Sequence, residues 1–462
     1  MSHDRTTGRP RRWEMGVKLK HWLTRLLDPS LRIWLLPGMH VKRWLALMMI
    51  GVAIMGLGIA YLLREVYLYA TLPGIFYYIT LQFIPRYVRG ILFLSVSTGL
   101  IFLSVIKLAH SLLVVVDRPG QREPLARRVY NYRFRTGGPR VVAIGGGTGL
   151  SRLLLGLKEY TDKITAIVTV GDDGGSSGRL RQEFNVLPPG DVRNCIAALA
   201  EADEEMRRLF QYRFEEGSGL EGHSFGNLFI VALSAITGSF EEAVRATSRI
   251  LAVRGQILPM TPTNVVLGAR MEDGDVVLGE SNITRQGRRI ARLFIRPADV
   301  RAYPEALEAI AAADLIVIGP GSLYTSVLPN LLVEDIREAV RCSRAFKVYV
   351  SNVATQHGET DHFSVADHVR VILDHAGPGL IDCVLANSNL RGDLPAAWHS
   401  QPVQPVGDLP PGIHLRLADV VQDDKRYHHD PAKLARALMR LYDDREQYAL
   451  SAIQPHDALH RP

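Results

Sequence analysis

The sequence of 462 residues predicts a parallel, doubly wound α/β domain that follows an N-terminal pair of membrane-spanning helices. From about Pro139 onward, short β-branched runs that end in glycine loops alternate with helical leucine spacing, which is the rhythm of β–α–β units. Two long uncharged runs precede that point, at residues 44–63 and 90–106. Charge divides the chain at the same place, because residues 1–140 carry a net charge of +15 and the remainder carries −8.

The composition excludes several classes of protein. Apolar residues make up 47% and charged residues 22% of the chain, so a packed core is expected and wholesale disorder is excluded. The mildly acidic C-terminal part does not suit a nucleic-acid surface, and no nucleic-acid partner is expected. The cysteines Cys195, Cys342 and Cys383 lie too far apart for a disulfide framework or a Cys-rich zinc site, and they fit a reducing compartment.

The two uncharged runs predict a transmembrane hairpin. At about 1.5 Å per residue, the run at 44–63 crosses a hydrocarbon core of about 30 Å. Residues 1–43 carry ten Lys or Arg and residues 117–140 carry seven, against three in residues 64–89. Both ends of the hairpin are therefore expected on the cytoplasmic side of the membrane. The alternative for either run is a helix buried in a soluble core.

Five segments are expected along the chain. They are a basic N-terminal region that can form an interfacial helix (1–43), two transmembrane helices with an interfacial loop (44–116), a basic linker (117–138), the α/β domain (139–445) and a C-terminal tail (446–462).

Strands and helices of the α/β domain follow one another in the expected alternation. The predicted strands are Val141–Ile144, Ile164–Val170, Asp314–Ile318 and Phe346–Val350, and the predicted helices are Ser151–Glu159, Glu334–Cys342 and one that begins at Pro431, with Asp430 as N-cap, and ends near Tyr442. Ligands of such sheets bind beyond the carboxyl ends of the strands. The polar residues that directly follow the apolar runs are therefore the candidates for a site.

Two glycine loops are assigned to a diphosphate. The first contains Gly145, Gly146, Gly147, Thr148 and Gly149, and the second contains Gly319, Gly321 and Ser322. Glycines after a strand let the backbone approach a phosphate, and the next helix offers free N–H groups. The first loop is not a dinucleotide fingerprint, because Leu150 stands at the third glycine position, and it has no P-loop lysine. The alternative is a tight turn without a ligand.

A second polar loop, at residues 171–179, contains Asp172, Asp173, Ser176, Ser177 and Arg179. Its carboxylates can hold Mg²⁺, accept a hydrogen bond from a ribose hydroxyl or act as a base. Its hydroxyls and its guanidinium can hold phosphate oxygens. The alternative is a plain surface loop.

Two further segments complete the candidate site. Asp191 is either the N-cap of an apolar helix at 195–200 or a second metal carboxylate that faces Asp172 and Asp173, while Arg193 and Asn194 steady an anion. The catalytic candidates are thus Asp172, Asp173 and Asp191, and the metal candidates are Asp173 and Asp191.

His223, Ser224 and Asn227 open the helix expected at 228–236 and are placed in the pocket, although a lone histidine is more often structural. No Ser-His-Asp constellation on a nucleophile elbow is found. His428 and His429 are adjacent, so on one helix or strand they cannot face one metal together.

Eight segments in collinear order resemble the YvcK-type gluconeogenesis factors, which are related to the CofD family of 2-phospho-L-lactate transferases. Over about residues 139–440, they are VAIGGGTGLS, TVGDDGGSSGRLR, PPGDVRNC, GHSFGNL, RGQILPMT, GPGSLYTS, NVATQHGETD and YHHDP. The membrane hairpin lies outside this resemblance.

The resemblance implies a Rossmann-like CofD fold and the binding of a UDP-sugar such as UDP-N-acetylglucosamine. It also implies a role in cell shape and cell-wall homeostasis during growth on gluconeogenic carbon, with the domain facing the cytoplasm of a bacterial cell. The CofD branch implies instead Mg²⁺-dependent transfer of a phospholactyl group from a nucleotide-linked donor to a deazaflavin, with metal at the carboxylate loop and Asp191. CofD-like relatives suggest a homodimer.

The forms GGSSGRLR and PPGDVRNC resemble the YvcK branch, so the expected function is UDP-sugar binding. Two alternatives stay open. One is a nucleotide-dependent transferase of the CofD type, and the other is a membrane scaffold whose α/β domain has lost its ligand.

Overall fold

The structure is a computed structural model that describes residues 41–69, 74–79, 81, 83–116, 137–391, 394 and 398–446. The chain divides into two compact units, Met1–Arg133 and Phe134–Pro462. The predicted N-terminal interfacial helix, most of the basic linker and nearly all of the C-terminal tail lie outside the described residues.

The described residues of the first unit form three helices, α3 (Val41–Tyr69), α4 (Ile75–Ile79) and α5 (Arg86–Val116). Helix α3 includes the whole uncharged run at 44–63, and α5 includes the run at 90–106, so both runs are helical. Judged by length and apolar character, no single helix among the described residues qualifies as a membrane span. The transmembrane hairpin therefore stays a prediction.

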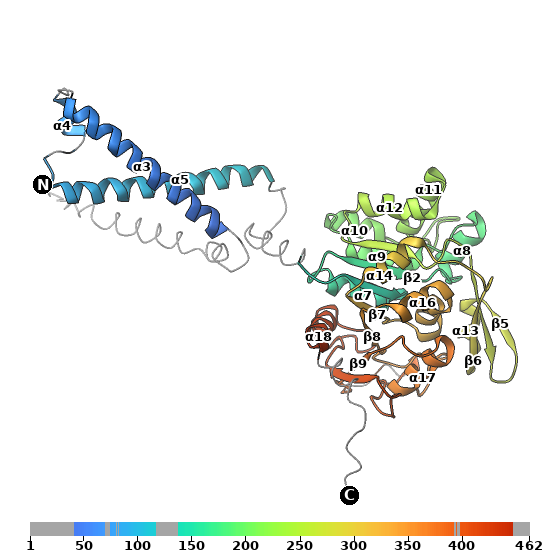
Figure 1. The fold of residues 1–462 in the computed structure, drawn as a ribbon. Helices are drawn as coiled ribbons and strands as arrows, with labels where there is room; N and C mark the ends of the chain where they lie inside the picture. The colour runs from blue at the N-terminus through green and yellow to red at the C-terminus, as the bar shows by residue number, and fades with distance from the viewer. Residues whose placement is uncertain are drawn as a thin grey trace, which may run out of the picture. The chain divides into compact units, whose positions relative to one another are not determined.

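The centre of the second unit is a sheet of seven strands in the order β10-β9-β8-β7-β1-β2-β3 (Figure 1). Their bounds are β1 (Val141–Gly145), β2 (Ile164–Val168), β3 (Gln256–Pro259), β7 (Leu315–Ile318), β8 (Phe346–Val350), β9 (Cys383–Asn387) and β10 (His414–Ala418). All neighbouring pairs are parallel. The chain winds outward from β1 in one direction and from β7 in the other, which confirms the doubly wound sheet.

The central strands are buried along their whole length, because helices cover both faces of the sheet. Every residue of β1 and β7 is buried, and Val141 pairs with Ile164 on one side and with Leu315 on the other. Strands buried on both faces are continuous apolar runs. This property made β1, β2, β7 and β8 recognisable in the sequence.

Twelve α-helices of the second unit lie within the described residues. They are α7 (Gly147–Leu157), α8 (Gly175–Phe184), α9 (Gly190–Leu199), α10 (Glu204–Gln211), α11 (Phe225–Thr237), α12 (Phe240–Ile250), α13 (Glu280–Gln286), α14 (Pro304–Ala312), α15 (Leu328–Leu332), α16 (Glu334–Cys342), α17 (Val365–Ala376) and α18 (Pro431–Asp443). A π-helix, Leu323–Val327, precedes α15. Helix α7 packs against α9 and α18, while α15 packs against α16 and α17. The predicted N-cap of α18 is confirmed, because the Asp430 side chain accepts from the N–H of Lys433.

A second, antiparallel sheet has the order β5-β4-β6, with β4 (Val266–Met271), β5 (Val276–Leu278) and β6 (Ile290–Arg296). This sheet was not predicted from the sequence. Its strands carry arginines and half-exposed positions, so they lack the continuous apolar runs that reveal the central strands. Helix α13 follows β5 in the chain and packs against β4 and β5.

Candidate functional site

The two glycine loops meet at the topological switch point of the sheet, between β1 and β7. A Cβ atom on Gly149 would lie 2.7 Å from the carbonyl oxygen of Pro320 and 2.9 Å from the backbone nitrogen of Gly321. Both neighbours are backbone atoms that cannot move aside, so only glycine permits this approach. The structure therefore brings together the two loops that the sequence assigned to one diphosphate.

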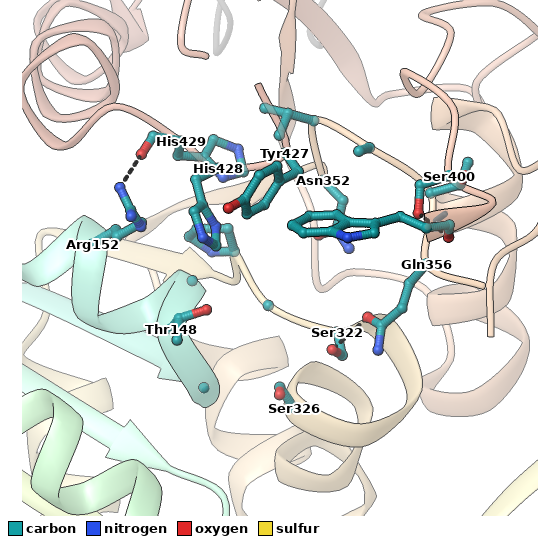
Figure 2. Close-up of a pocket in the computed structure, with 18 residues that line it drawn as sticks. Thr148, Arg152, Ser322, Ser326, Asn352, Gln356, Ser400, Tyr427, His428 and His429 are labelled. Atoms are coloured by element: carbon teal, nitrogen blue, oxygen red, sulfur yellow. Dashed lines mark hydrogen bonds between the residues drawn. The ribbon is translucent and has the colours of Figure 1, made fainter. Parts of the chain in front are cut away.

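A pocket of about 240 Å³ opens beside these loops, and we call it the switch-point pocket (Figure 2). One wall is the start of α7 with the loop after β7. A second wall is the loop after β8, and a third comes from Trp398, Ser400 and residues 427–429. Its lining residues are Gly147, Thr148, Gly149, Arg152, Pro320, Gly321, Ser322, Ser326, Asn352, Val353, Ala354, Thr355, Gln356, Trp398, Ser400, Tyr427, His428 and His429.

Arg152 is the only Lys, Arg, Asp or Glu among these described lining residues. It lies on α7, about one turn beyond the glycine loop. Its guanidinium donates to Oε1 of Gln422 at 2.5 Å. It also donates to the carbonyl oxygen of His429 at 3.2 Å (Figure 2), and these two partners fix its position. A single held cation beside free backbone N–H groups suits an anionic ligand.

An aromatic pair borders the opposite side of the pocket. The ring centroids of Trp398 and Tyr427 are 4.0 Å apart, and those of Tyr427 and His428 are 4.2 Å apart. Aromatic rings at the rim of a polar pocket offer flat surfaces on which a base or a sugar ring can stack.

The two histidines of the third wall are uncharged at neutral pH. Burial and the charge of Arg152 lower the pKa of His428 to about 4. Burial likewise lowers the pKa of His429 to about 4, and its Nε2 lies 3.2 Å from the carbonyl oxygen of Ser351, to which a neutral ring donates. The positive charge of the lining therefore comes from Arg152.

Four acidic side chains form a separate group behind the first glycine loop, and we call it the carboxylate cluster. It comprises Asp172, Asp173, Asp191 and Glu280. Burial, assisted by the charge of Asp172, raises the pKa of Asp191 to about 6, although the N–H of Gly147 donates to this carboxylate and opposes the shift. Burial and the neighbouring carboxylates raise the pKa of Glu280 to about 9.

The cluster corrects two expectations about local structure. Helix α9 begins at Gly190, so Asp191 lies inside the first turn with its carboxylate turned toward Gly147; its interpretation as an N-cap is wrong. Helix α8 begins at Gly175, so Ser176, Ser177 and Arg179 are helical rather than part of a flexible loop.

Asp172 and Asp173 face different neighbours. One oxygen of Asp172 accepts the N–H of Gly174 at 2.8 Å, and burial raises the pKa of its carboxyl group. One oxygen of Asp173 accepts the N–H of Ser281 at 2.9 Å, in the first turn of α13. The adjacent carboxylates after β2 therefore have separate structural partners.

Ser176, His223 and Asn227 form a buried hydrogen-bonded group that does not line the switch-point pocket. Nδ1 of His223 lies 3.0 Å from Oγ of Ser176, and Nδ2 of Asn227 donates to the same Oγ at 3.0 Å. Ser224 caps α11 by accepting from the N–H of Asn227. Burial lowers the pKa of His223, which keeps the ring neutral.

The predicted ligand residues thus divide into two groups. Those that line the switch-point pocket are Gly147, Thr148, Gly149, Gly321 and Ser322. Those that do not line it are Gly145, Gly146, Ser176, Ser177, Arg179, Arg193, Asn194, His223, Ser224, Asn227 and Gly319. Arg179 donates to the carbonyl oxygen of Glu221 at 2.6 Å, and Arg193 donates to Oδ1 of Asn194 at 2.7 Å.

Several lining residues had been given no role in the site. Asn352 and Gln356 directly follow β8, so the rule that sites follow strand ends was sufficient to find them. Tyr427 and His428 belong to a segment that the resemblance included. Arg152 and Trp398 carried no signal, because an arginine in a helix and a tryptophan in a loop are common.

The residues fit Mg²⁺ in the mode in which the ion joins a bound phosphate. Among the described residues, no group of three or more His, Cys, Asp or Glu side chains is placed to hold a metal ion. Mg²⁺ at phosphate sites, however, takes one or two carboxylates together with substrate phosphates and water. Asp191 contacts the glycine loop at Gly147 and interacts with the charge of Asp172, so this pair meets that requirement better than Asp173.

Residues 141–406 match the family described as 2-phospho-L-lactate transferase CofD. The chain belongs to the CofD family. A gluconeogenesis factor of Bacillus subtilis is 47% identical over 310 residues, which cover 66% of this chain and 98% of that protein. An X-ray crystal structure of a protein from Bacillus halodurans has a TM-score of 0.62 and 46% identity, and the match covers 65% of this chain and 99% of that one.

Another member of the CofD family shares more of the chain. A relative from Nostoc sp., whose name assigns it provisionally to the gluconeogenesis factors, is 47% identical over 425 residues, covering 88% of this chain and 92% of the relative. This coverage exceeds the second unit, so the match extends into the first unit. The predicted resemblance to the gluconeogenesis factors of the CofD family is thereby confirmed.

Proposed function

We propose that this protein binds a UDP-sugar of the UDP-N-acetylglucosamine class in the switch-point pocket. In this proposal it acts as a membrane-anchored regulator of the YvcK type, which supports cell shape and cell-wall homeostasis during gluconeogenic growth. One observation carries the proposal: two glycine loops converge beside a single fixed arginine, with an aromatic pair on the other side of the pocket.

The diphosphate lies at the start of α7 in this proposal. The first N–H groups of a helix have no partner within the helix, and its dipole favours an anion there. The N–H of Gly147 donates to Asp191, which leaves those of Thr148 and Gly149 for phosphate oxygens. Arg152 neutralises part of the remaining charge, and the rings of Trp398 and Tyr427 contact the uracil or the sugar.

Mg²⁺ supplies additional charge neutralisation when it is bound with the diphosphate. Asp172 and Asp191 would hold it, because Asp191 contacts the glycine loop at Gly147 and interacts with the charge of Asp172. Binding of a divalent cation beside these two groups would favour their ionised forms, which burial disfavours in the free protein.

Calorimetric titration of the full-length protein with UDP-N-acetylglucosamine, with and without Mg²⁺, tests the proposal. Trp398→Ala removes one of the stacking surfaces, so affinity should fall about tenfold. Tyr212→Ala is the matched control, since Tyr212 is exposed and pairs with Phe214 outside the pocket lining. Flat titrations with all uridine diphosphate compounds would exclude the proposed ligand.

Transfer chemistry of the CofD type is the second candidate function, and the carboxylate cluster favours it. Asp191 has a pKa near 6 and contacts the glycine loop, so its carboxylate can hold a proton or a metal beside a bound phosphate. Release of a nucleoside monophosphate from a nucleotide-linked donor, lost in Asp191→Asn, would support a transferase. Tight binding of the donor without turnover would favour the regulator.

The membrane anchor is proposed on the character of α3 and α5. Large apolar side chains of both helices are exposed, including Ile54 and Leu62 on α3 and Leu94 on α5. Lipid would cover such surfaces, and the arginines after α5 would face the cytoplasm. Full-length protein should stay in the membrane fraction after carbonate extraction, whereas a fragment without residues 1–136 should be released and still bind ligand. Release of the full-length protein would contradict the anchor.

A further inference from the structure

Two side chains, Ser322 and Gln356, link the switch-point pocket to a buried glutamate behind it. Oγ of Ser322 lies 2.6 Å from Oε1 of Gln356, and Nε2 of Gln356 lies 2.9 Å from Oε1 of Glu359. Ser322 and Gln356 both line the pocket and lie side by side in Figure 2. Glu359 is only 6% exposed and does not line it.

Donors converge on one oxygen of Glu359. Oε1 accepts from Nε2 of Gln356, from the hydroxyl of Thr284 at 3.3 Å and from the hydroxyl of Thr325 at 3.4 Å. The other oxygen, Oε2, has no hydrogen-bond partner among the described residues. If the carboxyl group takes up a proton, that proton therefore belongs on Oε2. Oε1 remains an acceptor in both protonation states.

This arrangement fixes the direction of every hydrogen bond in the series. Because Oε1 of Glu359 accepts, Gln356 must turn its NH₂ group toward Glu359 and its carbonyl oxygen toward Ser322. A carbonyl oxygen has no hydrogen to give. Ser322 must therefore donate its only hydroxyl proton to Gln356, and its oxygen is left with lone pairs alone for the pocket.

We infer that Glu359 and Gln356 are positioning residues that make the Ser322 hydroxyl a hydrogen-bond acceptor toward the ligand. At this point the pocket selects a ligand hydroxyl or N–H group and disfavours a phosphate oxygen, which is itself an acceptor. The inference rests on the proposed function, and it gives the Ser322 side chain a different role from the diphosphate contact expected from the sequence. The diphosphate is then held by the α7 side of the pocket, at Thr148, Gly149 and Arg152.

The test compares binding of UDP-N-acetylglucosamine with binding of analogues that each lack one donor. The set comprises the 2′-deoxy and 3′-deoxy ribose forms, the sugar forms without the 3-, 4- or 6-hydroxyl, and the N3-methyl uracil form. Calorimetry on full-length wild-type protein should show one analogue that binds about 3- to 10-fold more weakly. That penalty should vanish in Ser322→Ala and shrink in Glu359→Gln, whose carboxamide lets Gln356 reverse its amide. Glu216→Gln, at an exposed position, should keep it.

Two binding results would overturn the inference. One is the same set of penalties in wild type and in Ser322→Ala, because no ligand donor would then face this hydroxyl. The other is an equal loss of affinity for UDP-N-acetylglucosamine and for inorganic pyrophosphate in Ser322→Ala, because the hydroxyl would then contact the diphosphate.

A measurement without ligand separates this inference from the proposed function. In full-length protein labelled with ¹⁵N-glutamine, the side-chain amide signal of Gln356 is identified by its loss in Gln356→Glu. Glu359→Gln should shift that signal, and Glu216→Gln should not; an unchanged signal in Glu359→Gln would overturn the inference. A shifted signal together with flat UDP-sugar titrations would reject the proposed ligand while supporting the hydrogen-bond direction.

Discussion

The switch-point pocket and the carboxylate cluster share one glycine loop but differ in charge. Among the described residues, the pocket lining has a single charged side chain, Arg152, with two histidines that burial keeps neutral. The cluster has four acidic side chains, and the pKa values of Asp191 and Glu280 are raised to about 6 and about 9. One loop thus separates a surface suited to an anion from a group of carboxyl groups, of which Glu280 keeps its proton at neutral pH.

This difference shows how one loop can face two environments. The N–H of Gly147 donates to Asp191, whereas Thr148 and Gly149 line the pocket. Like charges this close to a diphosphate would oppose its binding unless they are protonated or joined by a cation. Recognition of the proposed ligand is therefore expected to depend on the pocket. The sensitivity of its binding to pH or to a metal ion is expected to depend on the carboxylate cluster.

The largest effect is expected when the two glycine loops are forced apart. In Gly149→Ala the new Cβ would lie 2.7 Å from the carbonyl oxygen of Pro320, so the phosphate cradle must open. UDP-sugar affinity measured by calorimetry should fall on the order of 100-fold, equivalent to about 2.7 kcal/mol. Gly171→Ala is the control, because its Cβ would have ordinary contacts of 3.7 and 4.0 Å. Normal binding by Gly149→Ala would place the ligand elsewhere.

Removing the cation of the pocket should have the next largest effect. Hydrogen bonds to a charged group contribute about 1.5–3 kcal/mol, so Arg152→Met should weaken UDP-sugar binding about 10- to 100-fold. Binding should also become less sensitive to salt, because the screened cation is gone. Calorimetry at two ionic strengths measures both the affinity for the UDP-sugar and its dependence on salt. An unchanged salt dependence would show that other charges hold the diphosphate.

In the carboxylate cluster, Glu280→Gln should change stability in a pH-dependent manner. The folded protein holds this proton up to a pKa of about 9, against 4.5 for the ordinary group. The contribution of Glu280 to stability is therefore full below about pH 4.5 and is lost as pH rises toward about 9. At pH 8 the free energy of unfolding of the variant should be about 1–2 kcal/mol higher than that of wild type. At pH 4.5 the two free energies of unfolding should be equal.

Chemical unfolding of both proteins at the two pH values measures this difference. Glu216→Gln, at an exposed position, serves as the control and should match wild type at both. A Glu280→Gln variant that is less stable than wild type at pH 8 would mean that the carboxylate is ionised and has a stabilising partner.

The smallest effect is expected when Arg179, which was predicted from the sequence to bind the ligand, is substituted. Arg179 donates to the carbonyl oxygen of Glu221 and does not line the pocket. Arg179→Met should therefore keep UDP-sugar affinity within about twofold of wild type, and it is the matched control for Arg152→Met. A tenfold loss in this variant would extend the binding site to α8.

The sequence was sufficient to predict four strands of the main sheet, β1, β2, β7 and β8, but not which residues of the following loops face the pocket. Strands such as Val141–Gly145 are buried on both sides, so their apolar runs are continuous. The polar residues after β2 were also found at a strand end. The direction in which Asp173 turns depends on α13, which follows β5 and whose placement cannot be predicted from a local pattern.

The pocket lining was harder to predict, because three of its walls come from distant parts of the chain. Gln356 follows a predicted strand and could be found by position, whereas Trp398 lies in an irregular segment. Arg152 belongs to a helix that was predicted, but its role depends on the carbonyl group of His429, which lies 277 positions away. Contacts over that separation leave no periodic signal in the sequence.

That separation has a consequence for synthesis. At about 5–20 residues per second, a ribosome needs roughly 15–55 seconds to proceed from the glycine loop to the third wall of the pocket. Throughout that interval the nascent chain contains β1 and the first glycine loop but no Tyr427 or His428 beside it. Ribosome-arrested chains that end before residue 427 should therefore fail to retain the proposed UDP-sugar, because Tyr427 and His428 complete the third wall of the pocket.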